Sequence, residues 1–291
     1  MVKNINIYKS LSVALCIITL IIVLVMVILG YPKNETTLAE NNEEKIPLPI
    51  IMYHSLLKDS KMQNDYTISP DIFENDLKFL KNNGYTTITV NDLINYTYSD
   101  NSLPEKCIML TFDDGYYNNY YYAFPLLKKY EAKAVISPIA SMVEKFSKEE
   151  NISVSYGTIG NKEIAEMLKS DCVEIQNHSY DLHRLTPRKG IKQKQGESVD
   201  EYKSSVSEDI IKAQKYFTDN ISYTPQCFVY PFGAKSTLTE GIIKELGFKC
   251  TLNCTEKMNY VSKNPDSLYE LGRFRRDGNE SIESLINRMY K

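Results

Sequence analysis

Short apolar runs and segments with helical spacing alternate along most of the chain. The runs at 48–53, 86–90, 107–112, 132–139, 172–176, 227–230 and 248–252 have the length of buried strands, and helical patterns cover 69–84, 121–130, 161–170, 199–218 and 236–247. The run at 107–112 is apolar on both faces, which is typical of parallel strands covered on both sides. The alternation predicts an α/β fold, specifically an irregular (β/α) barrel of about seven to eight parallel strands in one domain.

A longer apolar run precedes these units. Residues 11–30 contain no charged side chain, and as a helix they would span about 30 Å, the thickness of a bilayer core. The run exceeds the ~7–15 apolar residues of a signal peptide, so we expect one retained transmembrane helix. Lysines precede the run and glutamates dominate the segment after it, so the positive-inside rule places the N-terminus in the cytoplasm.

These patterns divide the chain into four segments. We expect a cytoplasmic tail at 1–10, a transmembrane anchor at 11–30, a flexible acidic linker at 31–46 and a folded domain at 47–291. The cell membrane is then the predicted location, with the folded domain outside the cell.

The composition bears on which partners the chain can bind and on whether it contains disulfide bonds. The net charge of −3, from 34 Lys and Arg against 37 Asp and Glu, leaves no basic surplus for nucleic acid. Five cysteines fall in the folded domain, and the sequence leaves open whether Cys250 and Cys254 pair. Tyrosine is abundant, with "YYNNYYY" at 116–122; such residues can stack on sugars, but they more often pack against helices.

Two adjacent carboxylates end one of the predicted strands. Asp113 and Asp114 follow the apolar run "CIMLTF", and Gly115 permits a sharp exit from the strand. Like charges this close raise one pKa and favour a bound cation. An Asp that caps the next helix is the alternative, but it accounts for only one of the two carboxylates.

Two of the three histidines of the chain follow another predicted strand. His178 and His183 are five residues apart, so they would not share one face of a helix and must converge from a loop. The carboxyl ends of parallel strands open on one face of a barrel, which brings this pair to the rim that carries the two aspartates. Ordinary surface histidines are the alternative, but the shared rim indicates a His-His-Asp metal site.

Three motifs resemble a known family. "TFDDG" (111–115), "HSYDLH" (178–183) and "VYPFG" (229–233) resemble the first three motifs of polysaccharide deacetylases of the NodB-homology, carbohydrate esterase 4 type. These are metal-dependent enzymes on an irregular (β/α) barrel that remove acetyl groups from glycans. The resemblance covers about residues 47–280, and the five-residue histidine spacing is that of the poly-N-acetylglucosamine deacetylase subgroup.

The resemblance implies a role for each matched residue. Asp114, His178 and His183 would bind a divalent metal, zinc first, with cobalt or nickel as alternatives, and Asp113 would be the general base. The third motif would contact substrate and help to hold the oxyanion through its backbone; its residues are Tyr230, Pro231, Phe232 and Gly233. The implied activity is the hydrolytic removal of N-acetyl groups from N-acetylglucosamine in an extracellular glycan, either poly-N-acetylglucosamine or peptidoglycan.

The chain also departs from the family pattern. The third motif lacks the Arg that orients the base, the chain has no Trp, and no histidine follows His183 to act as general acid. "IIMYH" (50–54) resembles the N-terminal element of the same subgroup, in which the barrel is circularly permuted and the histidine motif comes first. His54 also ends the first predicted strand, on the rim of the other motifs, so we expect it to be the acid; a packed core histidine is the alternative.

Two other functions stay open at this point. A glycan-binding protein that kept the fold but lost turnover would explain the missing Arg and Trp. A metal phosphoesterase would need a basic cluster for phosphate, and its best support is the segment "GRFRRDG", which holds Arg273, Arg275 and Arg276.

Overall fold

The computed structural model describes residues 17, 18, 21 and 45–291. The chain divides into two units at Glu43 and Glu44, and the folded part lies in the second, Glu44–Lys291. The predicted tail, nearly all of the predicted anchor and most of the predicted linker lie outside the described residues. Within the described part of the chain, no helix has both the length and the apolar character needed to cross a bilayer.

A parallel sheet forms the centre of the second unit. Its strands are β12 (Phe274–Arg275), β2 (Ile50–Tyr53), β6 (Cys107–Asp114), β7 (Ala134–Pro138) and β8 (Val173–Ile175) in that order, and β5 (Thr86–Ile88) also pairs with β6. Smaller ladders join β9 (Cys227–Val229) to β10 (Cys250–Leu252) and β3 (Ser55–Leu56) to β4 (Thr67–Ile68), both parallel, and β1 (Ile46–Leu48) to β11 (Asn259–Val261), antiparallel. The predicted parallel α/β architecture is confirmed.

Closure of these strands into a barrel is not confirmed. One bridge links Asn177, just past β8, to Phe228 in β9, and another links Leu252 in β10 to Leu271, shortly before β12. Continuous ladders are found in the six-stranded sheet and the separate pairs, not around one ring of seven or eight strands. The closed barrel therefore stays a prediction.

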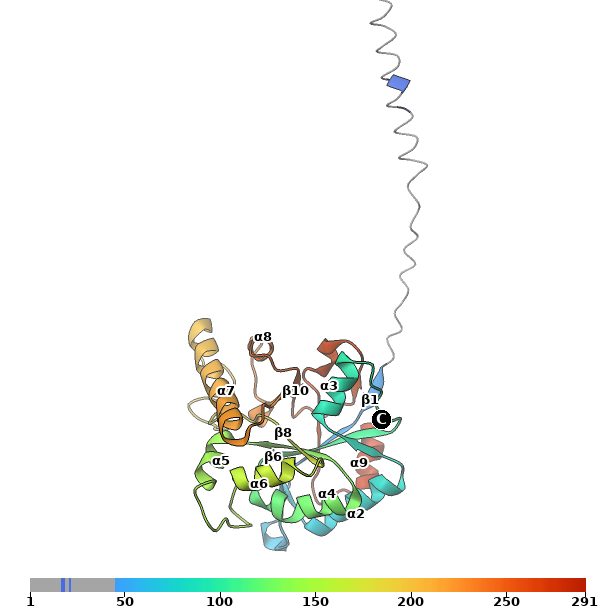
Figure 1. Cartoon of the computed structure of the whole chain (residues 1–291), viewed down its shortest axis with the longest axis vertical. Coiled ribbons are helices and arrows are strands. Elements are labelled where there is room, and N and C mark those ends of the chain that lie inside the picture. Colours follow the sequence, from blue (N-terminus) through green and yellow to red (C-terminus); the bar gives the residue numbers. More distant parts are fainter. Residues whose placement is uncertain (1–16, 19–20, 22–44) are drawn as a thin grey trace, which may run out of the picture. The chain divides into compact units, whose positions relative to one another are not determined.

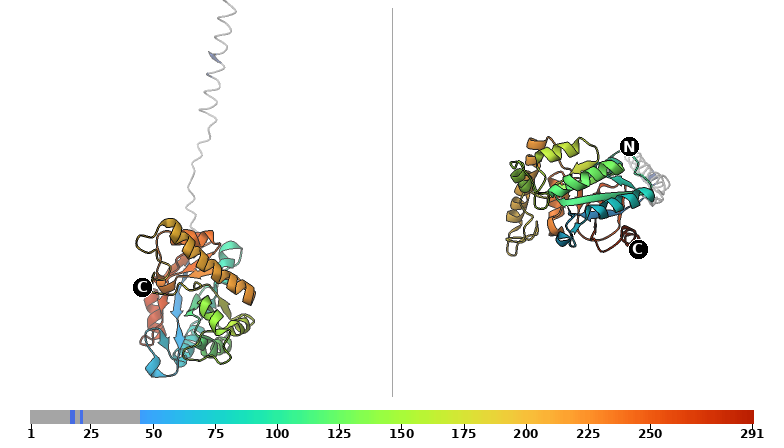
Figure 2. Two further views of the ribbon diagram at one scale, coloured as in Figure 1. Left: turned by 90° about the vertical axis from the view of Figure 1, so that its left-hand side faces the viewer. Right: turned by 90° about the horizontal axis from the view of Figure 1, so that it is seen from below.

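Helices surround the strands (Figures 1 and 2). They are α2 (Pro70–Asn82), α3 (Val90–Tyr98), α4 (Phe124–Tyr130), α5 (Ala140–Phe146), α6 (Asn161–Leu168), α7 (Val199–Ile221), α8 (Thr239–Glu245) and α9 (Ile282–Met289). The start of α2 follows its sequence signals: the Ser69 side chain accepts a hydrogen bond from Ile72 N, and Pro70 occupies the first turn.

Strand β6 is buried on both faces, as its composition predicts. Ile108, Leu110 and Phe112 pack into the cluster that also contains side chains of the helices α2, α4 and α9, whereas Met109 packs into a second cluster with Ile50 of β2. The second cluster also includes side chains from β7, β9 and β10. The strands therefore share one apolar interior, and their carboxyl ends lie at the same edge.

Some elements depart from the sequence pattern. The pattern at 86–90 predicts one strand, but β5 ends at Ile88, and Thr89 caps the start of α3 through a capping box with Asp92. The tyrosine-rich segment contains a π-helix, η2 (Asn119–Ala123), which a periodicity of 3.6 residues does not reveal.

Candidate active site

The predicted site residues converge on one cleft at the carboxyl ends of the strands. The cleft has a volume of about 700 Å³ and is lined by Met52, His54, Asn64, Tyr66, Thr67, Asp113, Asp114, Tyr116, His178, His183, Lys189, Phe232, Cys254, Glu256 and Arg275. Both aspartates and all three histidines of the sequence analysis are among them. Segments more than 170 residues apart in the chain, at His54 and Phe232, therefore meet in one cavity.

Asp114, His178 and His183 form a cluster that could hold a metal ion. Their ligand atoms all lie within 4.8 Å of one another. Asp114 Oδ1 is 3.3 Å from His183 Nε2 and 3.6 Å from His178 Nε2, and this buried oxygen has no hydrogen-bond partner among the residues that the structure describes. A buried, unpaired carboxylate oxygen facing two imidazole nitrogens is costly by itself, so the donor set and its geometry fit a divalent cation.

The backbone at the end of β6 aims the carboxylate of Asp114 into the cleft. Asp114 has φ 67° and Gly115 has φ 71°, so two successive residues adopt left-handed conformations. At Gly115 a Cβ atom would lie 2.4 Å from Pro138 Cβ, which excludes any other residue. The glycine after the aspartate pair thus permits both the turn and the close packing against β7.

Each histidine of the cluster is oriented by a different contact. His178 is buried, and its Nδ1 lies 2.8 Å from Val229 O, which can only accept; Nδ1 therefore carries the proton, and the lone pair of Nε2 is left free to bind a cation. Burial lowers the pKa of His178, although Asp113 and Asp114 oppose the shift. His183 packs against the Phe232 ring, with 4.1 Å between centroids and 31° between the ring planes.

Asp113 is held by an arginine from outside the three motifs. Arg273 Nη1 and Nη2 donate to the two carboxylate oxygens at 2.7 and 2.8 Å, and both side chains are almost fully buried. Burial alone would raise the pKa of Asp113, but Arg273, together with His178 and His54, outweighs the effect of burial, and the pKa is held well below its usual range. Arg273 lies just before β12, 160 residues from Asp113 along the chain, and it pairs with the predicted base although the third motif contains no arginine.

His54 lies where β2 ends and lines the same cleft. Its Nδ1 is buried and has no hydrogen-bond partner within the described part of the chain, and its ring makes an edge contact with Tyr66 at 4.9 Å between centroids. Burial lowers the pKa of His54, and the Asp113 and Asp114 carboxylates oppose that shift. The cleft position agrees with the sequence expectation for a reactive histidine, and its role remains a prediction.

Only Phe232 of the predicted substrate-binding motif lines the cleft. Tyr230 and Pro231 are buried, and the Tyr230 N–H donates to Leu252 O, so neither Tyr230 nor Pro231 is available for the predicted contact with substrate. Gly233 has φ 62°, and a Cβ there would lie 2.9 Å from Cys254 Cβ. The buried part of the motif supports Phe232, which in turn backs His183.

The basic segment before α9 does not form a phosphate site. Arg273 is taken by Asp113, and Arg276 is buried in a bidentate pair with Asp76 at 2.8 and 2.9 Å. Arg275 alone lines the cleft, and it lies 3.4 Å from an oxygen of Asp65. The best support for a phosphoesterase is therefore absent.

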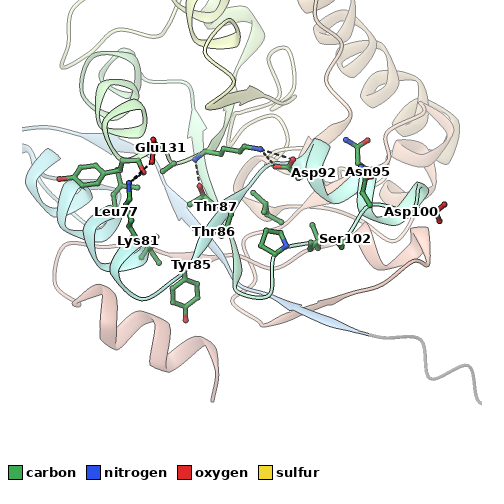
Figure 3. A pocket seen from close by; sticks show the side chains of 18 residues that line it. Leu77, Lys81, Tyr85, Thr86, Thr87, Asp92, Asn95, Asp100, Ser102 and Glu131 are labelled. Atoms are coloured by element: carbon green, nitrogen blue, oxygen red, sulfur yellow. Dashed lines mark hydrogen bonds and ion pairs between the residues drawn. The ribbon is translucent and has the colours of Figure 1, made fainter.

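A second cavity, of about 730 Å³, carries none of the predicted chemistry (Figure 3). It lies near the amino ends of β5 and β7, and its lysines are paired: Lys81 with Glu131 at 3.1 Å and Lys133 with Asp92 at 3.0 Å.

Cys250 and Cys254 do not form a disulfide, since both are free thiols.

A carboxylate pair and histidines gathered at the carboxyl edge of parallel strands fit the active site of a hydrolytic enzyme. Comparison with known proteins identifies the family: the model for "Polysaccharide deacetylase" matches residues 100–251. The chain belongs to the polysaccharide deacetylase family, and it is a deacetylase hydrolase. The family that the three motifs suggested is confirmed.

Individual relatives agree with this assignment. A poly-β-1,6-N-acetyl-D-glucosamine N-deacetylase of Staphylococcus aureus is 28% identical over 210 residues, 72% of this chain and 68% of that protein. The solved de-N-acetylase of Aggregatibacter actinomycetemcomitans is 25% identical with a TM-score of 0.71, over 83% of this chain and 99% of that one. A deacetylase of Streptococcus pyogenes in complex with acetate shares the fold, with a TM-score of 0.69, 23% identity and coverage of 84% and 99%.

Proposed function

We propose that this protein is a metal-dependent N-deacetylase that acts on N-acetylglucosamine residues of a glycan outside the cell. The single observation that supports this best is the buried Asp113–Arg273 pair beside the Asp114–His178–His183 cluster, in a cleft that also contains His54. One carboxylate is held ionised and apart, and the other faces two imidazoles. The two adjacent aspartates thus have different tasks.

Asp114, His178 and His183 are the residues that would hold a divalent metal, for which zinc is our first choice and cobalt or nickel the alternatives. Such an ion supplies Lewis-acid chemistry, since it polarises a carbonyl oxygen and lowers the pKa of water. His178 keeps its Nε2 available because its Nδ1–H is committed to Val229 O. Phe232 limits the ring positions open to His183.

Asp113 is the proposed proton acceptor. Arg273 keeps the Asp113 carboxylate ionised at neutral pH and fixes both of its oxygens. Asp113 can therefore accept the proton of the attacking water without first being deprotonated. The bidentate pair also prevents Asp113 from turning toward the cluster and becoming a fourth ligand. The cost of this arrangement is a weaker base.

His54 is the proposed general acid for the leaving amine. It lines the cleft, and both aspartates raise its proton affinity against the effect of burial. No other histidine is left for this step, since the chain has three and the metal cluster uses two. This assignment places the acid near the N-terminal end of the folded unit and the base in its middle.

The substrate proposal is poly-β-1,6-N-acetylglucosamine, with peptidoglycan as the alternative. It rests on the histidine spacing, on the N-terminal position of His54 and on the similarity to the Staphylococcus aureus enzyme. We also propose that residues 1–10 lie in the cytoplasm, that residues 11–30 anchor the chain in the cell membrane and that 47–291 form the catalytic domain, an irregular barrel; the anchor and the outside location rest on sequence alone.

A protein that only binds glycans is the second candidate, and one of its two supports is gone. This candidate was supported by the absence of an arginine to orient the base, but Arg273 contacts Asp113 and can serve that purpose. The test is amine release from a soluble N-acetylglucosamine oligomer by residues 45–291 with added zinc, cobalt or nickel. Metal binding without release of amine under any of the three would favour the binding protein.

A further inference from the structure

Two asparagines lie between the tyrosines of "YYNNYYY", and the proposed chemistry does not involve them. Asn118 and Asn119 are both fully buried, at 0% exposure, whereas Tyr121 in the same segment is about half exposed. Buried amides need partners, and a stacking platform for sugars would not need them at all. The segment therefore has a role other than presenting aromatic rings.

Both amides form hydrogen bonds with the residues at and just after His54. They also make two weaker ones: Asn118 Nδ2 donates to Val154 O at 3.2 Å, and Asn119 Nδ2 donates to Asn118 Oδ1 at 3.3 Å. Asn119 Nδ2 donates to His54 O at 2.7 Å. Asn118 Nδ2 donates to Ser55 Oγ at 3.0 Å, and Asn118 Oδ1 accepts from Leu56 N at 2.9 Å. Three consecutive residues, from His54 to Leu56, are thus held by two side chains that are more than 60 residues away in the chain.

The orientation of the Asn119 amide follows from this contact. The His54 carbonyl oxygen can only accept, so the amide nitrogen must face it, and the buried Asn119 Oδ1 is left without a partner in the described structure. An unpaired buried oxygen is unfavourable. Its presence indicates that the donor to His54 matters more than full satisfaction of the amide.

The backbone contacts matter for His54 because, among the described residues, no hydrogen bond to Nδ1 orients its ring. It occupies the one-residue gap between β2 and β3, and its Nδ1 has no hydrogen-bond partner among the described residues. A histidine that acts at a reactive centre is usually oriented through its second nitrogen. Here the position of the ring depends on the backbone beneath it and on the edge contact with Tyr66.

The local backbone is built to place the two amides there. Asn119 begins the π-helix η2, which closes with a hydrogen bond from Phe124 N to Asn119 O, and Asn119 N donates to Tyr116 O at 2.9 Å. π-Helical turns are rare, and they are frequent at functional sites. The segment begins two residues after Asp114, so one short stretch connects the metal cluster to the support of His54.

We propose that Asn119, assisted by Asn118, is a positioning residue that holds His54 for proton transfer to the leaving amine. The inference rests on the proposed role of His54 as general acid. The asparagine pair then affects turnover only through His54. It does not affect the metal cluster or the ground-state binding of substrate.

A double-mutant cycle tests this. In the zinc-loaded protein, Asn119→Ala should lower kcat on an N-acetylglucosamine oligomer by ~10–100-fold, the cost of a misplaced catalytic group, with KM and zinc content unchanged. In a His54→Ala background the same substitution should change kcat by less than about twofold, because residues acting as one unit are not additive. Asn83→Ala is the matched control: Asn83 Nδ2 also donates to a carbonyl, Phe79 O at 2.8 Å, but on the exposed end of α2.

The outcomes separate this inference from the proposed function. A His54→Ala protein with the normal rate would overturn the acid assignment. A slow His54→Ala protein with a folded, fully active Asn119→Ala variant would overturn the positioning role alone, and so would equal losses from Asn119→Ala in both backgrounds. If Asn119→Ala is unfolded at the assay temperature, Asn118→Ser, which keeps a hydroxyl near Ser55, is carried through the same cycle.

Discussion

The arginines of "GRFRRDG" offer a test of the base within one short segment. Arg273 and Arg276 are each buried in a bidentate carboxylate pair, whereas Arg275 is about one-third exposed and its ion pairs are 3.4 and 3.9 Å long. We consider the three Arg→Met variants. They share the same chemical change and differ in the charge that is left unpaired.

The magnitude for Arg273→Met follows from the charge that remains. Removing one partner of a buried ion pair costs about 3–5 kcal/mol, because the other charge stays buried without compensation. Arg276→Met should lose a similar amount through Asp76, whereas Arg275→Met should lose no more than ~1 kcal/mol, as is typical of exposed pairs. Only Arg273→Met should also lower kcat per folded molecule, by ~10²–10⁴-fold, because only this variant disturbs the proton acceptor.

The pH dependence of the loss gives a further check. In the native protein the pKa of Asp113 is depressed, so its favourable contribution is present at neutral pH and is lost only in strong acid. Without Arg273, burial raises that pKa above the unfolded value, and protonation then relieves the penalty as the pH falls. The stability deficit of Arg273→Met should therefore be larger at pH 7 than at pH 5.

Urea unfolding at both pH values, with amine release measured on the folded protein, carries out this test. The reasoning is refuted if Arg273→Met is no less stable than Arg275→Met. It is refuted for catalysis if folded Arg273→Met deacetylates at a near-normal rate, or if Arg276→Met loses as much activity per folded molecule.

Three further predictions concern single contacts. Asp113→Asn should keep its zinc and lose turnover by ~10²–10⁴-fold, whereas His178→Ala should lose zinc as well, as measured by metal content and amine release; a near-normal rate for Asp113→Asn would show that the base is wrongly assigned. Burial lowers the pKa of His54, so its protonated form is lost as the pH rises through a value below the pKa of a free histidine. We expect kcat to fall in that pH range and His54→Ala to remove the fall. An unchanged pH profile in the variant would show that His54 is a packing residue and not the general acid. Gly233→Ala should cost at least ~1–2 kcal/mol of unfolding free energy, since φ is 62° and the new Cβ meets Cys254, whereas Gly241→Ala, in α8 with open space around it, should stabilise by ~0.5–1 kcal/mol; equal effects would refute the strain argument.

The order of strands and helices could be predicted from the sequence because it depends on local periodicity. The apolar run 107–112 and its two aspartates, the loop histidines after β8, and the capped start of α2 all depend on residues within a few positions of one another. The shared rim could also be predicted, since parallel strands have their carboxyl ends on one side. His54, Asp113 and His183 could thus be placed together before any coordinates.

The sequence could not supply the identity of partners across long separations. Arg273 is 160 residues from Asp113, Arg276 is 200 residues from Asp76, and no local pattern marks either pair. The same segment, "GRFRRDG", has the pattern of an exposed basic cluster in the sequence. Only the placement of β12 beside β2 brings two arginines of this segment to buried carboxylates, Arg273 to Asp113 and Arg276 to Asp76, and leaves Arg275 at the cleft.

The third motif and the tyrosine-rich segment show the same limit at shorter range. Four residues from Tyr230 to Gly233 resemble one binding motif, but the close packing of β9 against β10 buries the first two and leaves Phe232 to face the cleft. In "YYNNYYY" the tyrosines attract attention by composition, and the buried amides do not. Local patterns determined which elements form and where the reactive groups lie along the chain. Tertiary packing decided which polar groups are buried away from water and must therefore pair with one another.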